Sequence, residues 1–518
     1  MQSKQFWLVF SFISIIMLVL DTVSVTIAFQ SYENIFQLIQ NIISINSNQL
    51  VKIKSLISED KLLLIKSLAV FISTLTTYFF IKKHRFLIES IIYFFNELIS
   101  KINNHFISIP TKIKLAICCI SIIKLVLILV IPLHLDEMFS YLFLANKGVL
   151  VSLSYYPGPN NHVFFNILSA LLLKLSLPSN LAIRLPSLFS DIFILFICSK
   201  YVYQSSKSIS ISNICLIIIS FSINYLPFSI SARGYVLACC LGLIAFIASE
   251  KLKAQPTFYG IIYIVSNSLA FLTIPTHLYL FASIVFFQIF IQKNWKISLK
   301  INTLTIFSTT ILYSPILILN GFDSLFNNNW VKSMSLNEFS PKINSFLDNY
   351  ISIITGLHYS VFNYLYLIIV FLLIYFSKSR KLNAYLFFYI FIVFSICVLQ
   401  RVIPFTRVFC YLNLTFSLIL ISYIVQNKAY KFLLIVSILT LFNNYQFIIN
   451  LIPFIESEKK IENEIAKNIQ QWKSQKIKYI YIKEEKTAYQ IQMYIIENHL
   501  AIKAKWQPNQ ELPFVSSN

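Results

Sequence analysis

Long apolar runs separated by short polar stretches recur along the whole 518-residue chain. Runs of about 20 residues are long enough for a helix that crosses the roughly 30 Å hydrocarbon core of a bilayer. The pattern therefore predicts an all-α polytopic membrane protein. About thirteen transmembrane helices are expected near residues 6–29, 62–81, 112–133, 184–203, 211–229, 235–250, 257–274, 277–292, 301–319, 361–377, 383–400, 405–425 and 430–453.

One further apolar stretch, residues 161–178, is interpreted differently. It is short, begins with Asn-His, contains Lys174 and ends at a proline. The distribution of charge between the loops decides its status, because cytoplasmic loops collect Lys and Arg. One set of alternate short loops holds twelve positive residues and the other set holds three, namely Arg233, Arg401 and Arg407. With the Lys-rich set in the cytoplasm, the chain must stay outside from 134 to about 183, so 161–178 is predicted as a juxtamembrane helix at the outer interface.

The same count places the N-terminus in the cytoplasm and the C-terminus outside. We predict three regions: an N-terminal two-span extension with an amphipathic linker (1–111), a transmembrane catalytic module (112–453), and a small extracytoplasmic α/β appendage (454–518). In the appendage, Ile461, Ile465, Ile469 and Trp472 recur at helical spacing, and a strand-like IKYIYI and a second helical run near 487–501 follow.

Composition agrees with a membrane protein, since 57% of the residues are hydrophobic and only 12% are charged. Soluble domains carry about 25% charged residues. The net charge of +21 does not indicate a nucleic-acid partner, because the 42 Lys and Arg are scattered through short loops without a basic, aromatic-studded patch. No nucleotide cofactor is expected either, because neither a P-loop nor a GxGxxG motif is present.

The first candidate site is HLDEMFSY (134–141), where Asp136 and Glu137 follow directly on a predicted span. Acids are rare at such positions and usually functional. A carboxylate there can act as a general base or hold a divalent cation. The alternative is a pair of solvated charges that cap an interfacial helix.

Other polar residues are predicted on the same outer face. The rigid turn YYPGPNNH ends in Asn161 and His162, which either contact a phosphate or metal beside Asp136 or cap a helix. His277, in a tight hairpin, is expected to be a satisfied polar residue or a ligand contact.

Arginines at the outer ends of spans form the third group. A guanidinium binds phosphate oxygens in bidentate fashion, so such arginines suit a lipid-linked phosphate. Snorkelling or structural pairing is the alternative for each. The candidates are Arg184 in LAIRLPS, Arg233 with Tyr235 in SARGYVL, and Arg401 and Arg407 in QRVIPFTRVF.

The order of these motifs resembles the GT-C superfamily of polytopic glycosyltransferases. A DE pair after a span, PNNH before an amphipathic helix, RLPS at the next span and ARGYVL two spans later are similar to the dolichyl-phosphate-mannose protein mannosyltransferases (glycosyltransferase family 39) and the aminoarabinose-transferase-like group. The match covers roughly residues 112–320, with weaker support to about 425. The second acid that some relatives carry after the arginine-tyrosine motif is absent from ARGYVLACC.

The resemblance implies transfer of a sugar from a polyprenyl-phosphate donor to a lipid, glycan or protein acceptor outside the membrane, usually with inversion. Asp136 would be the catalytic or metal-associated carboxylate, with Glu137 orienting it or sharing a divalent cation. Arg233 and Arg407, with His162, would stabilise the donor phosphate. The high Ile, Asn and Lys usage favours a bacterial inner membrane as the location.

Two other classes compete with an enzyme: a transporter or flippase for a lipid-linked or anionic solute, and a noncatalytic protein of envelope-polysaccharide assembly. A transporter should carry charges inside its spans and paired halves. The predicted spans are nearly free of charge and no duplicated halves are visible, which favours the glycosyltransferase.

Overall fold

The structure is a computed structural model. It describes residues 31, 33, 34, 36 and 37; 59–355 without 159, 160, 223 and 327–332; residue 368; and 379–511 without 476–478, 483, 499, 501 and 507–509. The predicted span 6–29 lies outside the described residues, as does 361–377 apart from residue 368.

The described chain divides into two compact units. Unit 1 takes its residues from Met1–Ser108, Ile244–Ser268 and Asn294–Gly321, and unit 2 takes Ile109–Leu243, Leu269–Lys293 and Phe322–Asn518. Unit 1 contains α4 (Glu59–Ile107) and α15 (Trp295–Asn320), with parts of α12 (Tyr235–Lys251) and α13 (Pro256–Thr273). Phe94 on α4 packs against Phe258 on α13 within this unit, with ring centroids 5.3 Å apart.

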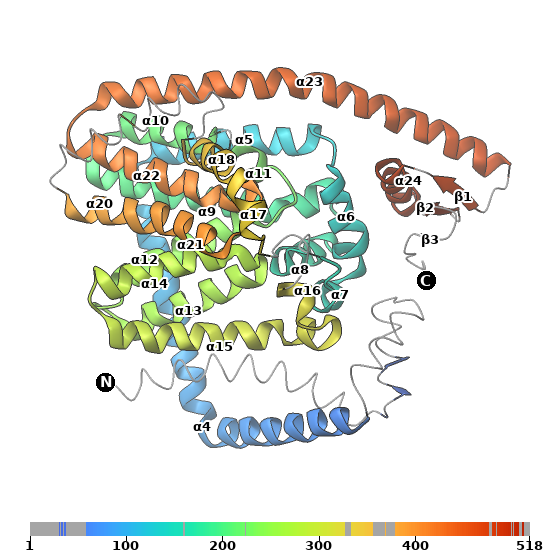
Figure 1. Ribbon diagram of the computed structural model, residues 1–518, viewed down its shortest axis with the longest axis horizontal. Coiled ribbons are helices and arrows are strands. Elements are labelled where there is room, and N and C mark those ends of the chain that lie inside the picture. The colour runs from blue at the N-terminus through green and yellow to red at the C-terminus, as the bar shows by residue number, and fades with distance from the viewer. Residues whose placement is uncertain are drawn as a thin grey trace. The chain divides into compact units, whose positions relative to one another are not determined.

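Unit 2 holds every candidate site residue, and the labels in Figure 1 identify its helices and strands. Its N-terminal helices are α5 (Thr111–Val130), α6 (Leu135–Phe143), η1 (Ala145–Lys147), α7 (Val149–Ser154), α8 (Val163–Leu173), α9 (Ser179–Ser206), α10 (Ile209–Ser220) and α11 (Leu226–Ser229). The next are η2 (Pro275–His277), α14 (Leu278–Phe290), α16 (Asp323–Phe326), α17 (Leu336–Phe339), η3 (Ser340–Lys342) and α18 (Ile343–Thr355). Then follow α20 (Arg380–Leu386), η4 (Phe387–Phe391), α21 (Ile392–Gln400), η5 (Thr406–Phe409) and α22 (Cys410–Gln426).

The C-terminal part of unit 2 contains the strands. Helix α23 (Tyr430–Ser474) leads to β1 (Tyr479–Ile482), α24 (Glu485–Glu497), β2 (Lys503–Trp506) and β3 (Gln510–Glu511). β1 pairs with β2 in parallel, Tyr479 opposite Lys503, and β2 pairs antiparallel with β3. Ile465 and Ile469 of α23 are buried in one apolar cluster with Ala488 of α24 and Met138 of α6. The helical face predicted for α23 is therefore a packing face.

Five helices in the described part are long and apolar enough to cross a membrane: Thr111–Val130, Ser179–Ser206, Pro256–Thr273, Arg380–Gln400 and Thr406–Gln426. Each coincides with a predicted span, so the structure supports a membrane protein with several spanning helices. The count of thirteen stays a prediction. The predicted span 211–229 is interrupted, because α10 ends at Ser220 and the chain turns before α11.

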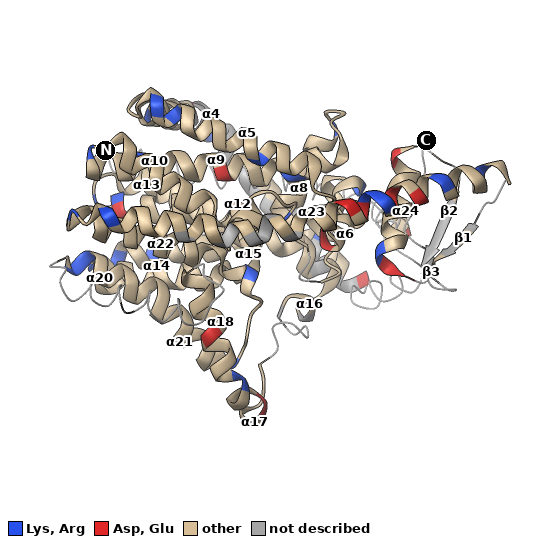
Figure 2. Cartoon of the chain, turned by 90° about the horizontal axis from the view of Figure 1, so that it is seen from above, with Lys and Arg blue, Asp and Glu red and all other residues tan. Residues whose placement is uncertain are grey.

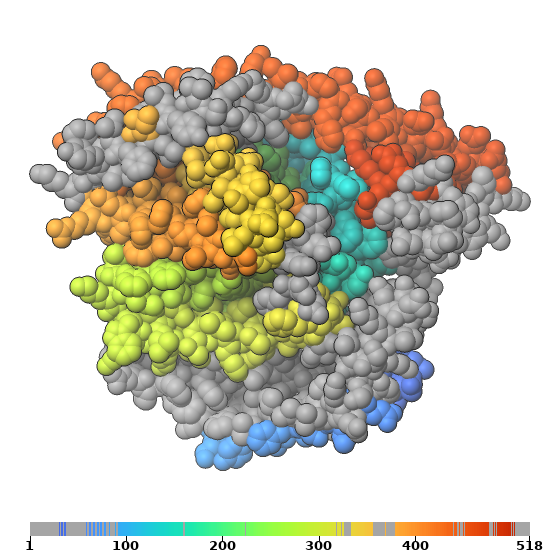
Figure 3. Space-filling view, viewed as in Figure 1, coloured from blue at the N-terminus to red at the C-terminus, as the bar shows by residue number. Residues whose placement is uncertain are grey.

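Charge is unevenly distributed over unit 2. Acidic and basic residues are mixed around α6, α24 and the C-terminal half of α23, whereas the charged residues of α20, at the other end, are Lys and Arg (Figure 2). On the face shown in Figure 3, the teal surface of α6 borders the red-orange surface of α23.

Candidate functional site

Glu137 anchors the start of α6. The chain leaves α5 at Val130 and enters α6 at Leu135, and the Glu137 carboxylate accepts a hydrogen bond from the backbone N–H of His134 at 2.8 Å. An acid in the first turn of a helix is favoured because backbone N–H groups there lack partners within the helix. Glu137 is only 2% exposed, which commits both of its oxygens to contacts within the protein.

Arg184 on α9 supplies the balancing charge. Its Nε donates to Glu137 Oε1 at 2.9 Å and its Nη2 to Glu137 Oε2 at 2.7 Å, a bidentate pair. The remaining hydrogen bonds go to the backbone carbonyls of Ile128, Ile131 and Pro132, where α5 ends. These five hydrogen bonds match the five N–H donors of a guanidinium. Arg184 therefore joins α5, α6 and α9.

This network changes the titration of Glu137. Burial alone raises the pKa of its carboxyl, but the Arg184 charge, the Arg184 hydrogen bonds and the N–H groups of His134 and Ala232 outweigh burial and lower the pKa. Glu137 is thus ionised at neutral pH. Its oxygens already accept from four groups, so they do not suit a metal ion.

The segment 230–234 is held in place from two sides. The N–H of Ala232 donates to Glu137 Oε1. The Ser187 hydroxyl donates to the carbonyls of Ser231 and Arg233 at 2.7 and 3.2 Å. RLPS and SARG, which are distant in sequence, thus form one hydrogen-bonded unit that places Arg233 beside α6.

Asp136 faces a different environment from Glu137. Its Oδ2 lies 2.9 Å from Nη1 of Arg407 and 3.6 Å from Nη2 of Arg233. The Asp136 side chain is 20% exposed, against 31% for Arg407 and 6% for Arg233. Among the residues that the structure describes, two guanidinium groups lie against one carboxylate at this partly open position, which gives the group a net charge of +1.

His162 and Tyr235 lie beside these arginines. The His162 ring meets the Tyr235 ring edge-on with centroids 5.0 Å apart, and Arg233 Nη2 donates to the Tyr235 hydroxyl at 3.4 Å. Gly234 permits this approach: a Cβ there would be 2.6 Å from Thr273 Cγ2 and 3.1 Å from His162 Cβ. A glycine is required at this contact because any side chain would displace one of its neighbours.

His162 is neutral in this position. It is 2% exposed, and neither ring nitrogen makes a hydrogen bond of normal geometry to the residues that the structure describes. Burial and the charges of Arg233 and Arg407 lower the pKa of His162 well below its ordinary value, although the Thr273 backbone acts in the opposite direction. The ring therefore adds no charge to the cluster.

The structure thus brings five predicted residues together: Asp136, His162, Arg233, Tyr235 and Arg407. Their chemical roles stay predictions. Two guanidinium groups, a carboxylate and a neutral imidazole are a set that can bind an anion and accept a proton.

Three other predicted residues lie apart from Asp136. Asn161 is 1% exposed and donates to the carbonyls of Ser152 and Tyr155, which fixes the turn before α8. Arg401 caps α21 in the left-handed conformation, with φ of 52°, and its carbonyl accepts from the N–H of Met334. His277 is buried with its ring 5.0 Å from the Phe271 ring, and it lines a small cavity together with Tyr235.

The side chains around Asp136 and Glu137 give little support for the divalent cation that is expected between these two acids. Within the described ranges, no group of three or more His, Cys, Asp or Glu side chains is arranged to hold a metal ion. Glu137 is engaged by Arg184 and Asp136 by Arg407.

One ion pair contradicts the expectation of nearly charge-free spans. Lys124 on α5 and Asp191 on α9 are both fully buried, with Nζ and Oδ1 2.8 Å apart, and Lys124 Nζ lies 5.2 Å from the centroid of the Tyr225 ring. Both residues fall inside predicted spans. The signal was present in the sequence, because a lone charge inside an apolar run of this length requires a partner.

The chain was also compared with known proteins. No protein-family model matches it. No curated protein sequence matches it either.

Proposed function

We propose that this chain is a membrane glycosyltransferase that moves a sugar from a polyprenyl-phosphate donor to an acceptor hydroxyl on the extracytoplasmic face. The observation that carries the proposal is the partly exposed Asp136 carboxylate held between Arg407 and Arg233. An acid meets two arginines there, at the outer end of a helix apolar enough to span a membrane. A charged phosphate that is bonded to a sugar and embedded in lipid is a substrate that such a site fits.

Binding begins with the excess positive charge. The phosphate of the donor engages Arg233 and Arg407, since a guanidinium prefers a bidentate contact with phosphate oxygens. Before the donor binds, Arg407 Nη1 and Arg233 Nη2 lie 2.9 and 3.6 Å from Asp136 Oδ2 and occupy its carboxylate. Once the phosphate shares these arginines, the Asp136 carboxylate is available to the acceptor.

The transfer itself is a single displacement. The Asp136 carboxylate takes the proton of the acceptor hydroxyl, and the hydroxyl oxygen forms a bond to the anomeric carbon as the bond from that carbon to the phosphate oxygen breaks. The negative charge on the departing lipid phosphate is stabilised by Arg233 and Arg407. One displacement inverts the configuration at the anomeric carbon.

Glu137 and Arg184 are positioning residues in this proposal. They fix α6 to the end of α5 and to α9 through buried hydrogen bonds, and they hold the backbone of Ala232. The direction of α6, and with it the position of Asp136, depends on these contacts. About thirteen spans, an extracytoplasmic C-terminal α/β appendage and a location in a bacterial inner membrane belong to the same proposal.

Transfer by the purified full-length protein in lipid nanodiscs tests the proposal. Radiolabelled polyprenyl-phosphate sugars are supplied with a mixture of lipid, glycan and peptide acceptors, and the label that leaves the lipid is counted. Asp136→Asn is expected to lower the rate about 10²- to 10⁴-fold, the usual contribution of a general base. Arg407→Gln should raise the donor KM and also lower kcat, because Arg407 both binds the donor phosphate and stabilises its charge as it leaves.

Asp348→Asn is the matched control, because Asp348 is an exposed carboxylate on α18 outside the cluster. The control should retain the wild-type rate. Undiminished transfer by Asp136→Asn would exclude Asp136 as the base. No consumption of any lipid-linked sugar by the wild type, under conditions in which one binds, would contradict the whole proposal.

The buried pair of Lys124 and Asp191 favours a second candidate, a transporter of a lipid-linked or anionic solute. Charges inside spans often mark a transport path. The double variant Lys124→Met with Asp191→Leu removes both charges together, so neither is left buried without its counterion. A transporter would lose solute movement in proteoliposomes, whereas the glycosyltransferase should retain its transfer rate.

A further inference from the structure

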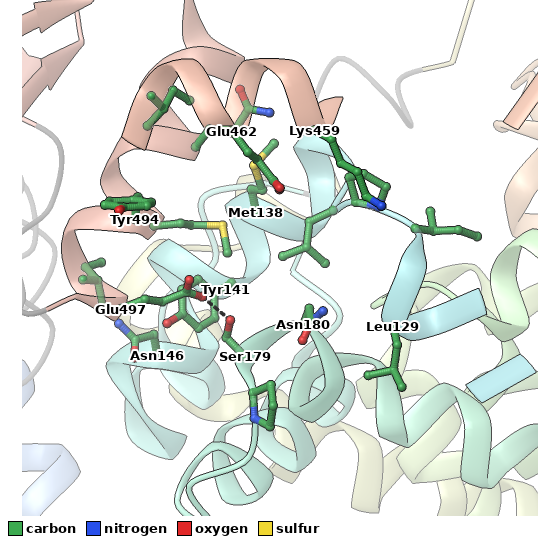
Figure 4. Close-up of a pocket in the computed structure, with 18 of the residues that line it drawn as sticks. Leu129, Met138, Tyr141, Asn146, Ser179, Asn180, Lys459, Glu462, Tyr494 and Glu497 are labelled. Atoms are coloured by element: carbon green, nitrogen blue, oxygen red, sulfur yellow. Dashed lines mark hydrogen bonds between the residues drawn. The ribbon is translucent and has the colours of Figure 1, made fainter. Parts of the chain in front are cut away.

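A second cavity lies on another side of α6. Its volume is about 1120 Å³, and residues of α6, α23, α24 and the α8–α9 turn line it (Figure 4). Met138 and Tyr141 of α6 face this cavity, whereas Asp136 does not line it. Successive helical residues are rotated by about 100°, so Met138 and Tyr141 point to a different side from Asp136. One short helix therefore separates two sites.

Uncharged polar groups are frequent in this cavity. The amides of Asn146, Asn180, Asn463 and Gln490 line it. Gln490 is held in orientation, because its amide nitrogen donates to the buried Glu458 carboxylate at 2.8 Å. Amides both donate and accept hydrogen bonds, so they suit a ligand that also does both.

The charge of the cavity is opposite to that of the Asp136 cluster. Lys459 is the cation of the lining, against the two carboxylates of Glu462 and Glu497. These carboxylates come from α23 and α24 and enter the same space (Figure 4). Burial, followed by the negative charges of Glu458 and Glu497, raises the pKa of Glu462. An excess of negative charge disfavours a phosphate.

Apolar side chains complete the lining. Tyr141 and Tyr494 add rings with polar tips, and Met138 and Met493 add adaptable apolar surface. Leu129 near the C-terminal end of α5 also contributes, so the cavity lies at one end of a candidate span. The lining therefore offers apolar surface and hydrogen-bonding edges together.

We infer that this cavity binds a neutral, hydroxyl-rich glycan segment of the acceptor, an inference that rests on the proposed transferase function. Sugar rings present apolar C–H faces and hydroxyl edges that donate and accept, which matches tyrosines and amides in one cavity. A lipid chain would leave the amides unpaired at a cost. The volume exceeds the usual 300–1,000 Å³ of small-molecule pockets, so it suits more than one sugar residue.

The two sites divide the substrates by charge. The cationic cluster at Asp136 takes the anionic donor, and the neutral to acidic cavity takes the uncharged acceptor. This division by charge restricts the acceptor: whether it is a lipid, a glycan or a protein, it carries a neutral glycan.

Glycan binding is measured separately from transfer. The probes are maltotetraose and the neutral tetramer of N-acetylglucosamine, titrated against the full-length protein in nanodiscs by saturation-transfer difference NMR. Asn463→Trp places a large ring in the cavity from an exposed position on α23. It should lower the affinity for the bound probe at least about tenfold, equivalent to about 1.4 kcal/mol.

Gln470→Trp is the matched control, since residue 470 is exposed on the same helix and does not line the cavity. It should bind as the wild type does. Ala466→Trp fills the cavity from a second position and should reproduce the loss. Asp136→Asn should leave probe binding unchanged.

The outcomes separate the inference from the proposed function. Probe binding that is blocked by Asn463→Trp and by Ala466→Trp supports the glycan site, even if no sugar is transferred, in which case the transferase proposal alone fails. Binding that persists in both variants, or no binding of either probe to the wild type, overturns the glycan site. Displacement of the probe by polyprenyl phosphate with the same sensitivity to Asn463→Trp would also overturn it.

Discussion

Two neighbouring acids, Asp136 and Glu137, have opposite surroundings. Glu137 is buried under Arg184 and backbone N–H groups, and Asp136 is partly exposed between two arginines. At the scale of single residues, burial distinguishes the roles of the two acids: the buried Glu137 is structural, and the partly exposed Asp136 is the proposed base. The contacts of Glu137 fix the direction of α6, and those of Asp136 are open to exchange with a ligand.

Arg184→Ala should strongly destabilise the protein. Its removal leaves the Glu137 carboxylate buried without its ionic partner and three carbonyls at the end of α5 without a donor. Breaking a buried pair in this way costs about 3–5 kcal/mol. Thermal unfolding in detergent measures the loss.

Arg184→Lys tests whether the bidentate pair with Glu137 is the source of this stability, because a lysine has three donors and cannot reproduce that pair. It should recover only part of the stability. A wild-type melting temperature for either variant would show that the network is not structural.

His162 should make stability dependent on pH in the mildly acidic range. Its pKa is lowered in the folded state, so the unfolded state binds a proton first as the pH falls below about 6.5. Stability contributed by neutral His162 is therefore complete above pH 6.5 and is lost progressively at lower pH. Melting temperatures between pH 5 and 8 should show this slope.

In His162→Gln the same slope should be reduced, because glutamine does not titrate. The lowered pKa of Glu137 acts in the same direction at more acidic pH, and that part of the profile should remain. An unchanged slope above pH 5 would mean that His162 is not the titrating group.

At the scale of elements, the position of the segment 230–234 depends on close packing around Gly234. Gly234→Ala should displace Thr273 or His162, because the added Cβ would lie 2.6 Å from Thr273 Cγ2. Overpacking of this kind costs typically about 1–3 kcal/mol. Because Arg233 is the preceding residue, the donor KM should rise as well.

Gly158→Ala is a suitable control for this change, since a Cβ at Gly158 meets no atom within 4 Å. Unfolding curves and donor titrations of the two variants should differ. Equal stability of both would indicate that Thr273 moves aside without cost.

Several elements of this region could be predicted from the sequence, and others could not. Loop charge and span parity placed Asp136, His162, Arg233 and Arg407 on one face, and the structure brings them together. The sequence did not show that all five donors of Arg184 would be used within the protein, because hydrogen-bond geometry depends on where α5 ends. A lone charge in an apolar run indicates that Lys124 and Asp191 each need a partner, but at a separation of 67 residues the sequence does not identify them as partners of each other.

At the scale of the whole molecule, the predicted topology is directly testable. Loops rich in Lys are expected in the cytoplasm, and residues 134–183 outside. In a cysteine-free variant, Gly158→Cys should react with a membrane-impermeant maleimide in intact cells. Lys253→Cys should react only after the membrane is permeabilised.

Labelling of Lys253→Cys in intact cells would invert the topology and move the Asp136 cluster to the cytoplasmic face. A donor carried on the outer leaflet would then be out of reach. The labelling experiment therefore also bears on the proposed substrate.

The buried pair between α5 and α9 has a consequence for biogenesis. Lys124 and Asp191 are 67 residues apart, so at about 5–20 residues per second the ribosome completes Asp191 roughly 3–13 s after Lys124. An unpaired lysine at the centre of a membrane helix costs about 2.5–3.5 kcal/mol during insertion. We expect α5 to be retained at the translocon until α9 emerges, so that the two helices enter the lipid as a pair.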